Sequence, residues 1–554
     1  MPLGDFLVAY LRRAGVEHLF GLPGDLVLNL FHRFATQRGL RIVTLSHEPA
    51  VGFAADGYAR ATGQMGVVVV TYGAGGLNVV NAVAGSFAEE VPVLVISGGP
   101  GEQETKLGTL IHHQAKEIES QHRIFQEVSC ASCVIRGASG AAEQIHELVS
   151  TIRARKRPGY LEIHRDLVET SIGVPAELVR WDGSIAEPRS DSAKGAEAAR
   201  ETADRINSAR RPVVIVGIEV HREGATRDVV ALADRLGAPV ATTVLSRGAF
   251  PMYHPLYLGL HMGNLGPAPI RRRVAEADLI LALGALRSDI NLGVSSRAIA
   301  PERMVQALGG QVHISRHTYT DVRLRPFVRA IRRIRGLRRH REQVEYADNL
   351  KRPRAEAHAP IPINDLLLSV NQFLEGRRGY HVVAESGDML FGGLEVRVPP
   401  GGLYFAQGFY ASMGYGVPGA LGAQIGSGKR PLVLCGDGAF QMTGSELSHA
   451  SRHGCNPIII VVNNGGWGIF RPVSPHADLL ELPNWPYAEM AEGWGGLGIR
   501  VRNRRELCDA LERAHREPRF ALIEAIVDPD DLSPITSRYI RASANQGRQR
   551  SSEA

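Results

Sequence analysis

Short runs of β-branched and aliphatic residues alternate with helical patterns along almost the whole chain. GVVVVTY is followed by LNVVNAVAGSFAEE, and PLVLCGD is followed by a helical stretch and then by PIIIVVNN. Strands that alternate with helices in this way form parallel sheets whose faces are covered by the helices. The sequence therefore predicts an α/β protein.

The 554 residues exceed the size of one ordinary core, and polar stretches divide them into blocks. RWDGSIAEPRSDSAKGAE resembles a linker after the first block, and KRPRAEAHAPIPI opens the last. We predict three doubly wound parallel-sheet domains and a loose end. The predicted ranges are domains at 1–180, 195–340 and 360–530 and a flexible basic tail at 531–554.

Composition excludes several classes of protein. The chain is 44% hydrophobic and 22% charged, as in soluble globular proteins, and no run approaches 18 apolar residues, so no membrane span is expected. The N-terminus lacks the pattern of a signal peptide, and five scattered cysteines suit a reducing cytoplasm. Cys130-Ala-Ser-Cys133 is interpreted as structural. Much of the net charge of +6 lies between Arg329 and Arg354, which favours a solvated helix face or linker over nucleic-acid binding.

The stretch CGDGAFQMTGSELSHASRHGCNPIIIVVNN carries the most specific chemistry. Two apolar strands are separated by enough residues for a helical crossover, so Asp437 and Asn464 would lie at the carboxyl ends of neighbouring strands, where open α/β sheets bind ligands. Gly436 and Gly438 allow a phosphate to approach the backbone. The side-chain oxygens, a backbone carbonyl and phosphate oxygens suit Mg²⁺. Either dipeptide alone would be only a tight turn or a strand cap.

The segment Gly436–Asn464 resembles the diphosphate and metal motif of thiamine-diphosphate-dependent enzymes, which begins GDG and ends NN. The resemblance implies that Asp437, Asn464 and the Gly466 carbonyl hold Mg²⁺. It extends to about Pro529, through FGLPGD, SHEPAVGFAADGYAR and TYGAGGLN. In the family the cofactor lies between the pyrimidine domain of one subunit and the diphosphate domain of another, which implies a homodimer or a dimer of dimers.

The resemblance also implies which residues contact the cofactor. Glu48 stands where the family's glutamate meets the aminopyrimidine ring and promotes removal of the thiazolium proton. YASMGYGVP resembles the segment that bends the cofactor, with Met413 as the wedge and the Ala411 carbonyl as an acceptor. AESGDMLF resembles another contacting segment, with Asp388 near the diphosphate and Ser386 beside the substrate. The other implied contacts are Gly436, Gly438, Ala439, Trp467, Gly468 and Ile469.

Further residues indicate which reaction is catalysed. Asp25 and the doublet His112-His113 match the acid and paired histidines of the pyruvate and indolepyruvate decarboxylase group, where they can shuttle protons near neutral pH. Phe470 stands where pyruvate decarboxylases carry a glutamate, and the phenylpyruvate decarboxylase branch also has an apolar residue there. Leu390 replaces a tryptophan common in pyruvate-specific enzymes, which would enlarge the pocket. The expected pocket walls are Leu390, Phe391, Trp467 and Phe470.

The sequence therefore predicts a decarboxylase that converts a bulky or aromatic 2-oxo acid, of the phenylpyruvate or indolepyruvate type, to its aldehyde and CO₂. One alternative is a thiamine-dependent carboligase, because the missing acid at Phe470 would give a second carbonyl compound time to compete with a proton. Another is a catalytically silent cofactor-binding protein, against which Glu48, Asp437 and Asn464 argue. Nucleic-acid binding through Arg332–Arg341 ranks below both.

Overall fold

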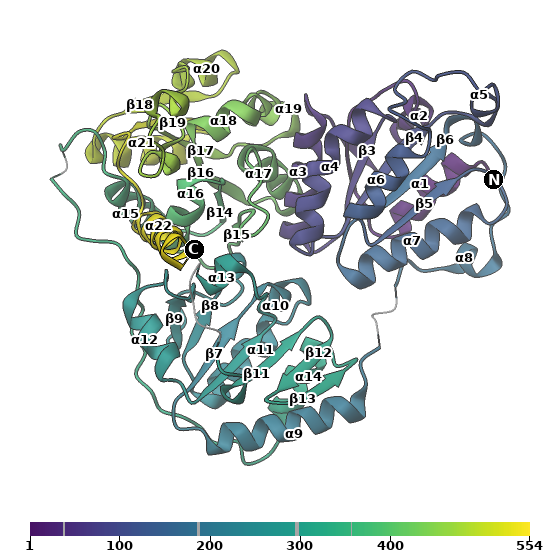
Figure 1. The fold of residues 1–554 in the computed structure, drawn as a ribbon. Coiled ribbons are helices and arrows are strands. Elements are labelled where there is room, and N and C mark those ends of the chain that lie inside the picture. Colours follow the sequence, from purple (N-terminus) through teal and green to yellow (C-terminus); the bar gives the residue numbers. More distant parts are fainter. Residues whose placement is uncertain (37–38, 186–188, 294–298, 356, 554) are drawn as a thin grey trace. The chain divides into compact units, whose positions relative to one another are not determined.

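Three α/β sheets follow one another along the chain in the computed structural model, which describes residues 1–36, 39–185, 189–293, 299–355 and 357–553 and side chains up to residue 543 (Figure 1). The first and third sheets each have six strands, and every recorded pairing in them is parallel. The second has seven strands. The predicted α/β class with three sheets is confirmed. The expected linkers include residues 186–188 and 356, which lie outside the described residues.

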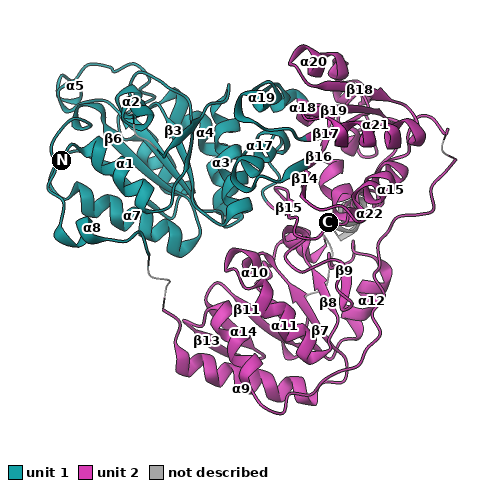
Figure 2. Ribbon diagram, turned by 180° about the vertical axis from the view of Figure 1, so that it is seen from behind, with its two compact units in different colours: residues 1–188, 410–431, 441–457 teal, residues 189–409, 432–440, 458–554 magenta. Residues whose placement is uncertain are grey.

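The chain divides into two compact units, shown in different colours in Figure 2. Unit 1 contains residues 1–188, 410–431 and 441–457, and so combines the first sheet with two pieces from later in the chain. Unit 2 contains residues 189–409, 432–440 and 458–554. The three predicted domain ranges therefore match the sheets better than they match the compact units.

The first sheet has the order β2-β1-β3-β4-β6-β5. Its central strand β3 is fully buried, as expected for a parallel strand covered on both faces. The sequence missed β1 and the half-exposed edge strand β5. The strands are β1 (His18–Gly21), β2 (Arg41–Val43), β3 (Gly66–Val70), β4 (Val93–Gly99), β5 (Ala131–Ile135) and β6 (Gly159–His164). The helices of unit 1 are α1 (Leu3–Arg13), α2 (Leu28–Thr36), α3 (Glu48–Thr62), α4 (Ala74–Ala88), α5 (Glu102–Lys106), α6 (Ser120–Val128), α7 (Ala141–Arg155), α8 (Ala176–Arg180), α17 (Gly416–Ser427) and α19 (Ala450–His453).

The second sheet has the order β13-β12-β11-β10-β7-β8-β9. Strand β12 runs antiparallel to both of its neighbours, β11 and β13, whereas the sequence predicted a parallel sheet. The apolar run that begins at Pro212 is a strand as far as Val216, Gly217 packs closely on Gly284, and a helix begins at Ile218. The strands are β7 (Pro212–Val216), β8 (Val240–Thr242), β9 (Tyr257–Leu260), β10 (Leu279–Leu283), β11 (Met304–Leu308), β12 (Gln311–Ile314) and β13 (His317–Thr320). The accompanying helices are α9 (Ser192–Ser208), α10 (Ile218–Arg222), α11 (Thr226–Leu236), α12 (Ala268–Glu276), α13 (Asp289–Leu292) and α14 (Leu324–Arg333).

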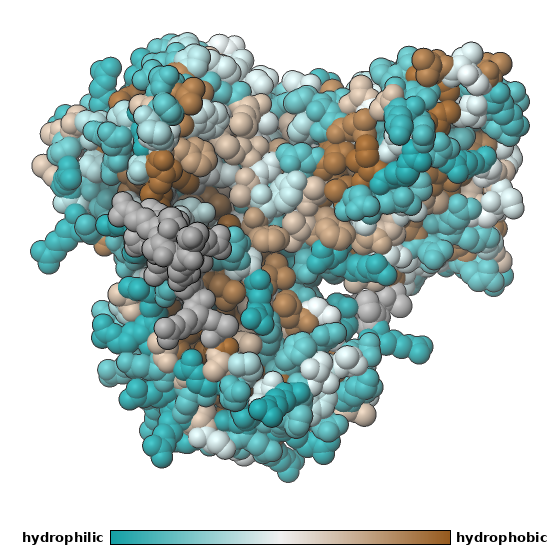
Figure 3. Space-filling view, in the orientation of Figure 1, coloured by the Kyte–Doolittle hydropathy of each residue, from teal (hydrophilic) through white to brown (hydrophobic). Residues whose placement is uncertain are grey.

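Part of the arginine-rich region is explained by an acid on a neighbouring helix. Asp228 of α11 pairs with Arg325, Arg329 and Arg332 of α14, at 3.1, 3.0 and 2.7 Å. These charges lower the pKa of Asp228, although its burial acts to raise it. Figure 3 shows a mainly hydrophilic surface over α9 and α14. Ion pairs with Asp228 on a partly exposed helix face therefore account for Arg329 and Arg332 of the arginine-rich region and for the nearby Arg325.

The third sheet has the order β15-β14-β16-β17-β19-β18. The sequence missed its edge strands β15 and β18, of which the first has two residues and the second is half-exposed. The strands are β14 (Tyr380–Ala384), β15 (Tyr404–Phe405), β16 (Arg430–Gly436), β17 (Ile458–Asn463), β18 (Leu497–Val501) and β19 (Ala521–Ile526). The accompanying helices are α15 (Ile363–Leu374), α16 (Asp388–Gly392), α18 (Asp437–Thr443), α20 (Tyr487–Gly493), α21 (Arg504–Arg516) and α22 (Pro534–Glu553).

The predicted loose tail is a helix, α22, and its first turns are packed in unit 2. Ser533 and Thr536 are fully buried, and Tyr539 stacks on Phe391 with the ring centroids 5.2 Å apart. The polar composition of the segment concealed the apolar spacing of Ile535, Tyr539 and Ile540, which gives the helix a face to bury. Among the described residues, no helix is both long and apolar enough to cross a membrane.

Candidate active site

The residues predicted to hold a metal lie at one edge of the third sheet. Asp437 begins α18 directly after β16, and Asn464 follows β17. These strands are parallel neighbours, with Gly436 opposite Val462, so both side chains leave the sheet at the carboxyl ends of its strands. The amide of Gly466 donates to Asp437 Oδ2 at 3.1 Å and to Asn464 Oδ1 at 3.2 Å. The crossover expected from the sequence thus brings the two motif ends together.

Asp437 is a buried carboxylate that fits a cation. It is 2% exposed, and the salt bridges of the described residues give it no cationic partner. The amide of Gly438 donates to its Oδ1 at 2.8 Å, yet burial raises the pKa of Asp437 to about 6. Because burying a carboxylate is costly without a compensating charge, this position suits a divalent ion with oxygen ligands.

The backbone around Asp437 is closely packed against the loop after β17. A Cβ atom added at Gly438 would lie 2.5 Å from the ring of Trp467, and one added at Gly468 would lie 2.3 Å from Asn464 Nδ2. Ala439 is also buried, whereas Ile469 is half-buried against the core of unit 2. A side chain at position 438 would meet the Trp467 ring, and one at position 468 would displace the Asn464 amide, which explains the glycines at these positions.

Glu48 lies in unit 1 as the first residue of α3. An acid at this position is stabilised by the helix dipole. Its Oε2 accepts a hydrogen bond of 2.8 Å from Asn78 Nδ2 on α4. Sequence reasoning did not identify Asn78, because the two residues belong to different helices and are 30 positions apart.

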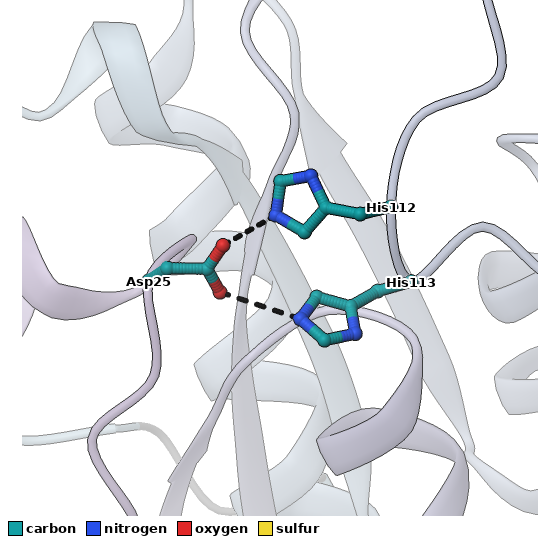
Figure 4. A group of neighbouring side chains, drawn as sticks. All are labelled: Asp25, His112 and His113. Carbon is teal, nitrogen blue, oxygen red and sulfur yellow. Dashed lines mark hydrogen bonds and ion pairs between the residues drawn. The ribbon is translucent and has the colours of Figure 1, made fainter.

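Asp25, His112 and His113 form a compact cluster in unit 1 (Figure 4). Asp25 Oδ2 bonds to Nε2 of His112, and Oδ1 lies 3.5 Å from Nε2 of His113. Burial acts to raise the pKa of Asp25, but the hydrogen bond with His112, a backbone amide and the two imidazoles outweigh it and hold the pKa below its usual value. The side chains are between 34% and 56% exposed, so the cluster can exchange protons with solvent or with a ligand.

A buried chain of hydrogen bonds reaches this cluster through the backbone contact between Gly73 and His113. His113 has a left-handed φ of 69°, and a Cβ atom at Gly73 would lie 1.9 Å from its carbonyl oxygen. The Gly73 amide donates to Gln121 at 2.6 Å, Gln121 donates to the Tyr160 hydroxyl at 2.6 Å, and Tyr160 donates to Glu162 at 2.5 Å. Burial raises the pKa of Glu162 to about 7. Gln121, Tyr160 and Glu162 lie outside every motif noted in the sequence, so nothing in it indicated this chain of hydrogen bonds.

The loop that contains Ala411 and Met413 is attached to α4 within unit 1. Ala411 has a φ of 58°, in the left-handed region that few residues other than glycine adopt. Asn81 Nδ2 donates to the Ser412 hydroxyl at 2.7 Å. This contact, together with the one described next, holds a strained loop in place.

A second attachment uses a buried charge cluster. The amide of Tyr410 donates to Glu89 Oε1 at 3.1 Å, and Glu89 Oε2 pairs with Arg60 at 2.8 Å. Arg60 also pairs with Asp56 at 2.5 Å, and all three charged residues are at most 3% exposed. Removing Arg60 would leave two buried carboxylates without their shared cation, so the attachment depends on Arg60.

The segment AESGDMLF lies in unit 2, and its predicted site residues differ in their contacts. The carboxylate of Asp388 accepts from the amide and hydroxyl of Ser533, the latter at 2.7 Å, so it caps α22. Burial raises the pKa of Asp388. Ser386, Leu390 and Phe391 are buried in unit 2.

Phe470 differs from the other predicted pocket walls. It belongs to a 3₁₀ turn at Gly468–Phe470 and is 52% exposed, while Leu390 is 2% exposed and part of the hydrophobic core. The role of these residues as walls of one substrate pocket stays a prediction. Trp467 is intermediate in exposure because its ring lies on Gly438.

Comparison with known proteins places the whole chain in one family. Three models match: the thiamine pyrophosphate enzyme N-terminal TPP binding domain at residues 1–124, the central domain at 199–332 and the C-terminal TPP binding domain at 389–525. An indole-3-pyruvate decarboxylase of Azospirillum brasilense is 39% identical over 550 residues, 98% of each chain. An alpha-keto-acid decarboxylase of Mycobacterium ulcerans is 30% identical over 97% of this chain and 95% of its own, and pyruvate decarboxylase 4 of Arabidopsis thaliana is 31% identical over 99% and 92%. Family models at both ends and full-length similarity to decarboxylases agree with the site geometry, and the chain belongs to the thiamine pyrophosphate-dependent 2-oxo-acid decarboxylases.

Proposed function

We propose that this protein decarboxylates a 2-oxo acid with a bulky or aromatic side chain, of the phenylpyruvate or indolepyruvate type, and releases the aldehyde and CO₂. The observation that carries the proposal is the meeting of Asp25 with both imidazoles of His112 and His113, in a chain similar over its length to an indole-3-pyruvate decarboxylase. Such a cluster supplies the two proton transfers that aldehyde release requires.

The cofactor site is proposed to use the edge of the third sheet. Asp437, Asn464 and the Gly466 carbonyl would hold Mg²⁺, and the buried carboxylate of Asp437 would gain the positive charge that it lacks. Thiamine diphosphate, when bound, supplies a nucleophilic carbon and an electron sink for the pair left by departing CO₂. Gly436 and Gly438 leave room for its diphosphate beside the backbone.

Glu48 is proposed to hold a proton at the pyrimidine ring. Its carboxylate is oriented by the hydrogen bond from Asn78, which leaves the other oxygen for the ring nitrogen. Ala411 and Met413 would contact the same ring system, and α4 keeps their loop fixed through Asn81 and Glu89. We propose that the cofactor is shared between two copies of this chain, in a homodimer or a dimer of dimers.

The proton transfers are assigned to the exposed cluster. Once CO₂ has left, one imidazole would deliver a proton to the reacting carbon, and the cluster would then take the hydroxyl proton as the aldehyde forms. Asp25 lies between the two rings and stabilises whichever one is charged. We also propose a cytoplasmic location, which the five scattered cysteines support.

Carboligation is a second candidate, and Phe470 is the observation that favours it. Phe470 offers no proton at the position where pyruvate decarboxylases carry a glutamate, and it is half exposed. A second carbonyl compound can therefore compete with the proton. Product analysis with an added acceptor aldehyde separates the two outcomes, because a hydroxyketone as the main product would favour carboligation.

The direct test is a substrate panel with thiamine diphosphate and Mg²⁺. Phenylpyruvate and indolepyruvate are expected to give aldehyde faster than pyruvate or branched 2-oxo acids, with products identified by chromatography. Absence of aldehyde from every acid would overturn the proposal. Glu48→Gln should abolish turnover while the fold is kept, and a variant with full turnover would remove Glu48 from its assigned role.

A further inference from the structure

We propose that Asp25, His112 and His113 also form a binding site for a transition-metal cation of the zinc class. Each residue offers one ligand atom, and these atoms lie within 4.8 Å of one another. In Figure 4 both imidazoles point a ring nitrogen at the same carboxylate, Nε2 in each case. It is the one such group of three metal-ligating side chains found in the described part of the chain.

The donor set selects the class of cation. Two imidazole nitrogens and one carboxylate are ligands for Zn²⁺, Co²⁺, Ni²⁺ and Cu²⁺, and three protein ligands leave positions open for water. Mg²⁺ prefers oxygen ligands alone, as offered around Asp437. The chain would therefore present two sites of different chemistry, which ions of the two classes would fill selectively.

The site is accessible and largely preformed. The three side chains are 48%, 56% and 34% exposed, in the order Asp25, His112 and His113, so an ion can enter from solvent. The left-handed backbone of His113 is fixed by Gly73, whose amide is bound by the buried Gln121. A ligand whose backbone is already ordered loses less entropy on binding, which favours affinity.

A cation bound at this cluster would also affect the reaction, an inference that rests on the proposed function. A cation bound to Nε2 of both histidines occupies the atoms through which protons would pass. Transition-metal ions would therefore inhibit decarboxylation by blocking the proton transfers, without displacing Mg²⁺.

The binding test uses the full chain without a histidine tag, freed of metal by a chelator and measured without cofactor or substrate. An Asp437→Asn background removes the oxygen-rich site. Calorimetric titration with zinc chloride is expected to show one Zn²⁺ per chain, and Co²⁺ should give the visible absorption of nitrogen-ligated cobalt. Adding His112→Ala or Asp25→Asn should weaken binding by at least about tenfold and abolish the cobalt spectrum.

A matched control comes from His317, an exposed histidine with Glu201 at 3.0 Å but no second imidazole nearby in the described contacts. His317→Ala should leave the zinc affinity unchanged. Zinc binding that is unaffected by both His112→Ala and Asp25→Asn would overturn the proposal. Because this measurement needs no turnover, it stays decisive even if no 2-oxo acid is converted.

Inhibition is measured separately in the wild-type enzyme saturated with Mg²⁺ and thiamine diphosphate. Added Zn²⁺ should lower the rate of aldehyde release at concentrations that fill the apo site, and a chelator should restore it. The inhibitory role would be overturned if zinc binds the apo chain, binds more weakly to the His112→Ala and Asp25→Asn variants, and yet leaves the rate of the wild-type enzyme unchanged.

Discussion

Asp437 and Asp25 are the same side chain in opposite surroundings. Asp437 is 2% exposed at the end of β16, and its burial raises its pKa to about 6. The Asp25 side chain is 48% exposed, and although burial also acts to raise its pKa, His112 and its other partners hold the pKa below the usual value. The difference lies first in burial, which is far deeper at Asp437, and then in the partners, which are backbone amides at Asp437 and imidazoles at Asp25.

The comparison separates two functions. A buried acid without a cationic partner offers its carboxylate to an ion, and a bound ion would stabilise the charged form that burial disfavours. An exposed acid between two imidazoles stabilises protonated histidine and can follow a moving proton. Substitution of Asp437 should therefore abolish cofactor binding, whereas substitution of Asp25 should impair the reaction and leave cofactor binding intact.

The largest expected effect is at Asp437. Asp437→Asn removes the one charged side chain of the proposed metal site, so Mg²⁺-dependent binding of thiamine diphosphate and all turnover should be lost. The wild-type thermal midpoint should rise when Mg²⁺ and cofactor are added at about 100 times their dissociation constants, equivalent to about 2.7 kcal/mol. The variant should show no rise, and a normal rise would contradict the assignment.

Asp25→Asn should separate chemistry from cofactor binding. Turnover is expected to fall by about 100-fold or more, the range for loss of a general acid or base, while the Mg²⁺-dependent rise in thermal midpoint remains. Rapid kinetics that follow CO₂ and aldehyde separately would locate the defect in aldehyde release. Parallel loss of cofactor binding would show that the two aspartates do not serve different steps.

The pH dependence of stability tests the ionisation of Glu162, which ends the buried chain of hydrogen bonds next to the exposed cluster. Its folded pKa of about 7 lies above the usual 4.5, so between these values the unfolded chain loses a proton that the folded chain keeps. Stability is therefore expected to fall as pH rises through this window, by about 3 kcal/mol in total, and to level off above pH 7. Glu162→Gln should remove this dependence, so its thermal midpoint relative to the wild type should rise from pH 5 to pH 7 and then stay constant. Parallel profiles would contradict the assigned ionisation.

The smallest effect on stability is expected at Asn78, the partner of the partly exposed Glu48. Asn78→Ala removes one exposed hydrogen bond, so the free energy of unfolding should change by less than about 0.5 kcal/mol. Turnover should nevertheless fall, though less than in Glu48→Gln, because the carboxylate loses its orientation. Thermal denaturation and initial rates check both parts, and unchanged turnover would show that Asn78 does not orient Glu48.

The fold could be predicted where burial leaves a local signature. Strands buried on both faces read as unbroken apolar runs, so β3, β16 and β17 were identified, whereas the half-exposed edges β5 and β18 were not. The hairpin β12–β13 and the packed helix α22 were also missed. Their sequences mix polar and apolar residues, so neither gives the unbroken apolar run that marks a buried strand.

The sequence by itself determined the elements and the chemical groups: the crossover that joins Asp437 to Asn464, the acid that opens α3, and the pair His112-His113. These depend on residues close together or on motifs of fixed spacing. Only the tertiary structure decided the environments, including the burial of Asp437, the contact of Asp25 with two imidazoles, and the chain from Gly73 to Glu162. An environment is the sum of groups from many distant segments, and the spacing of residues along a chain does not specify that sum.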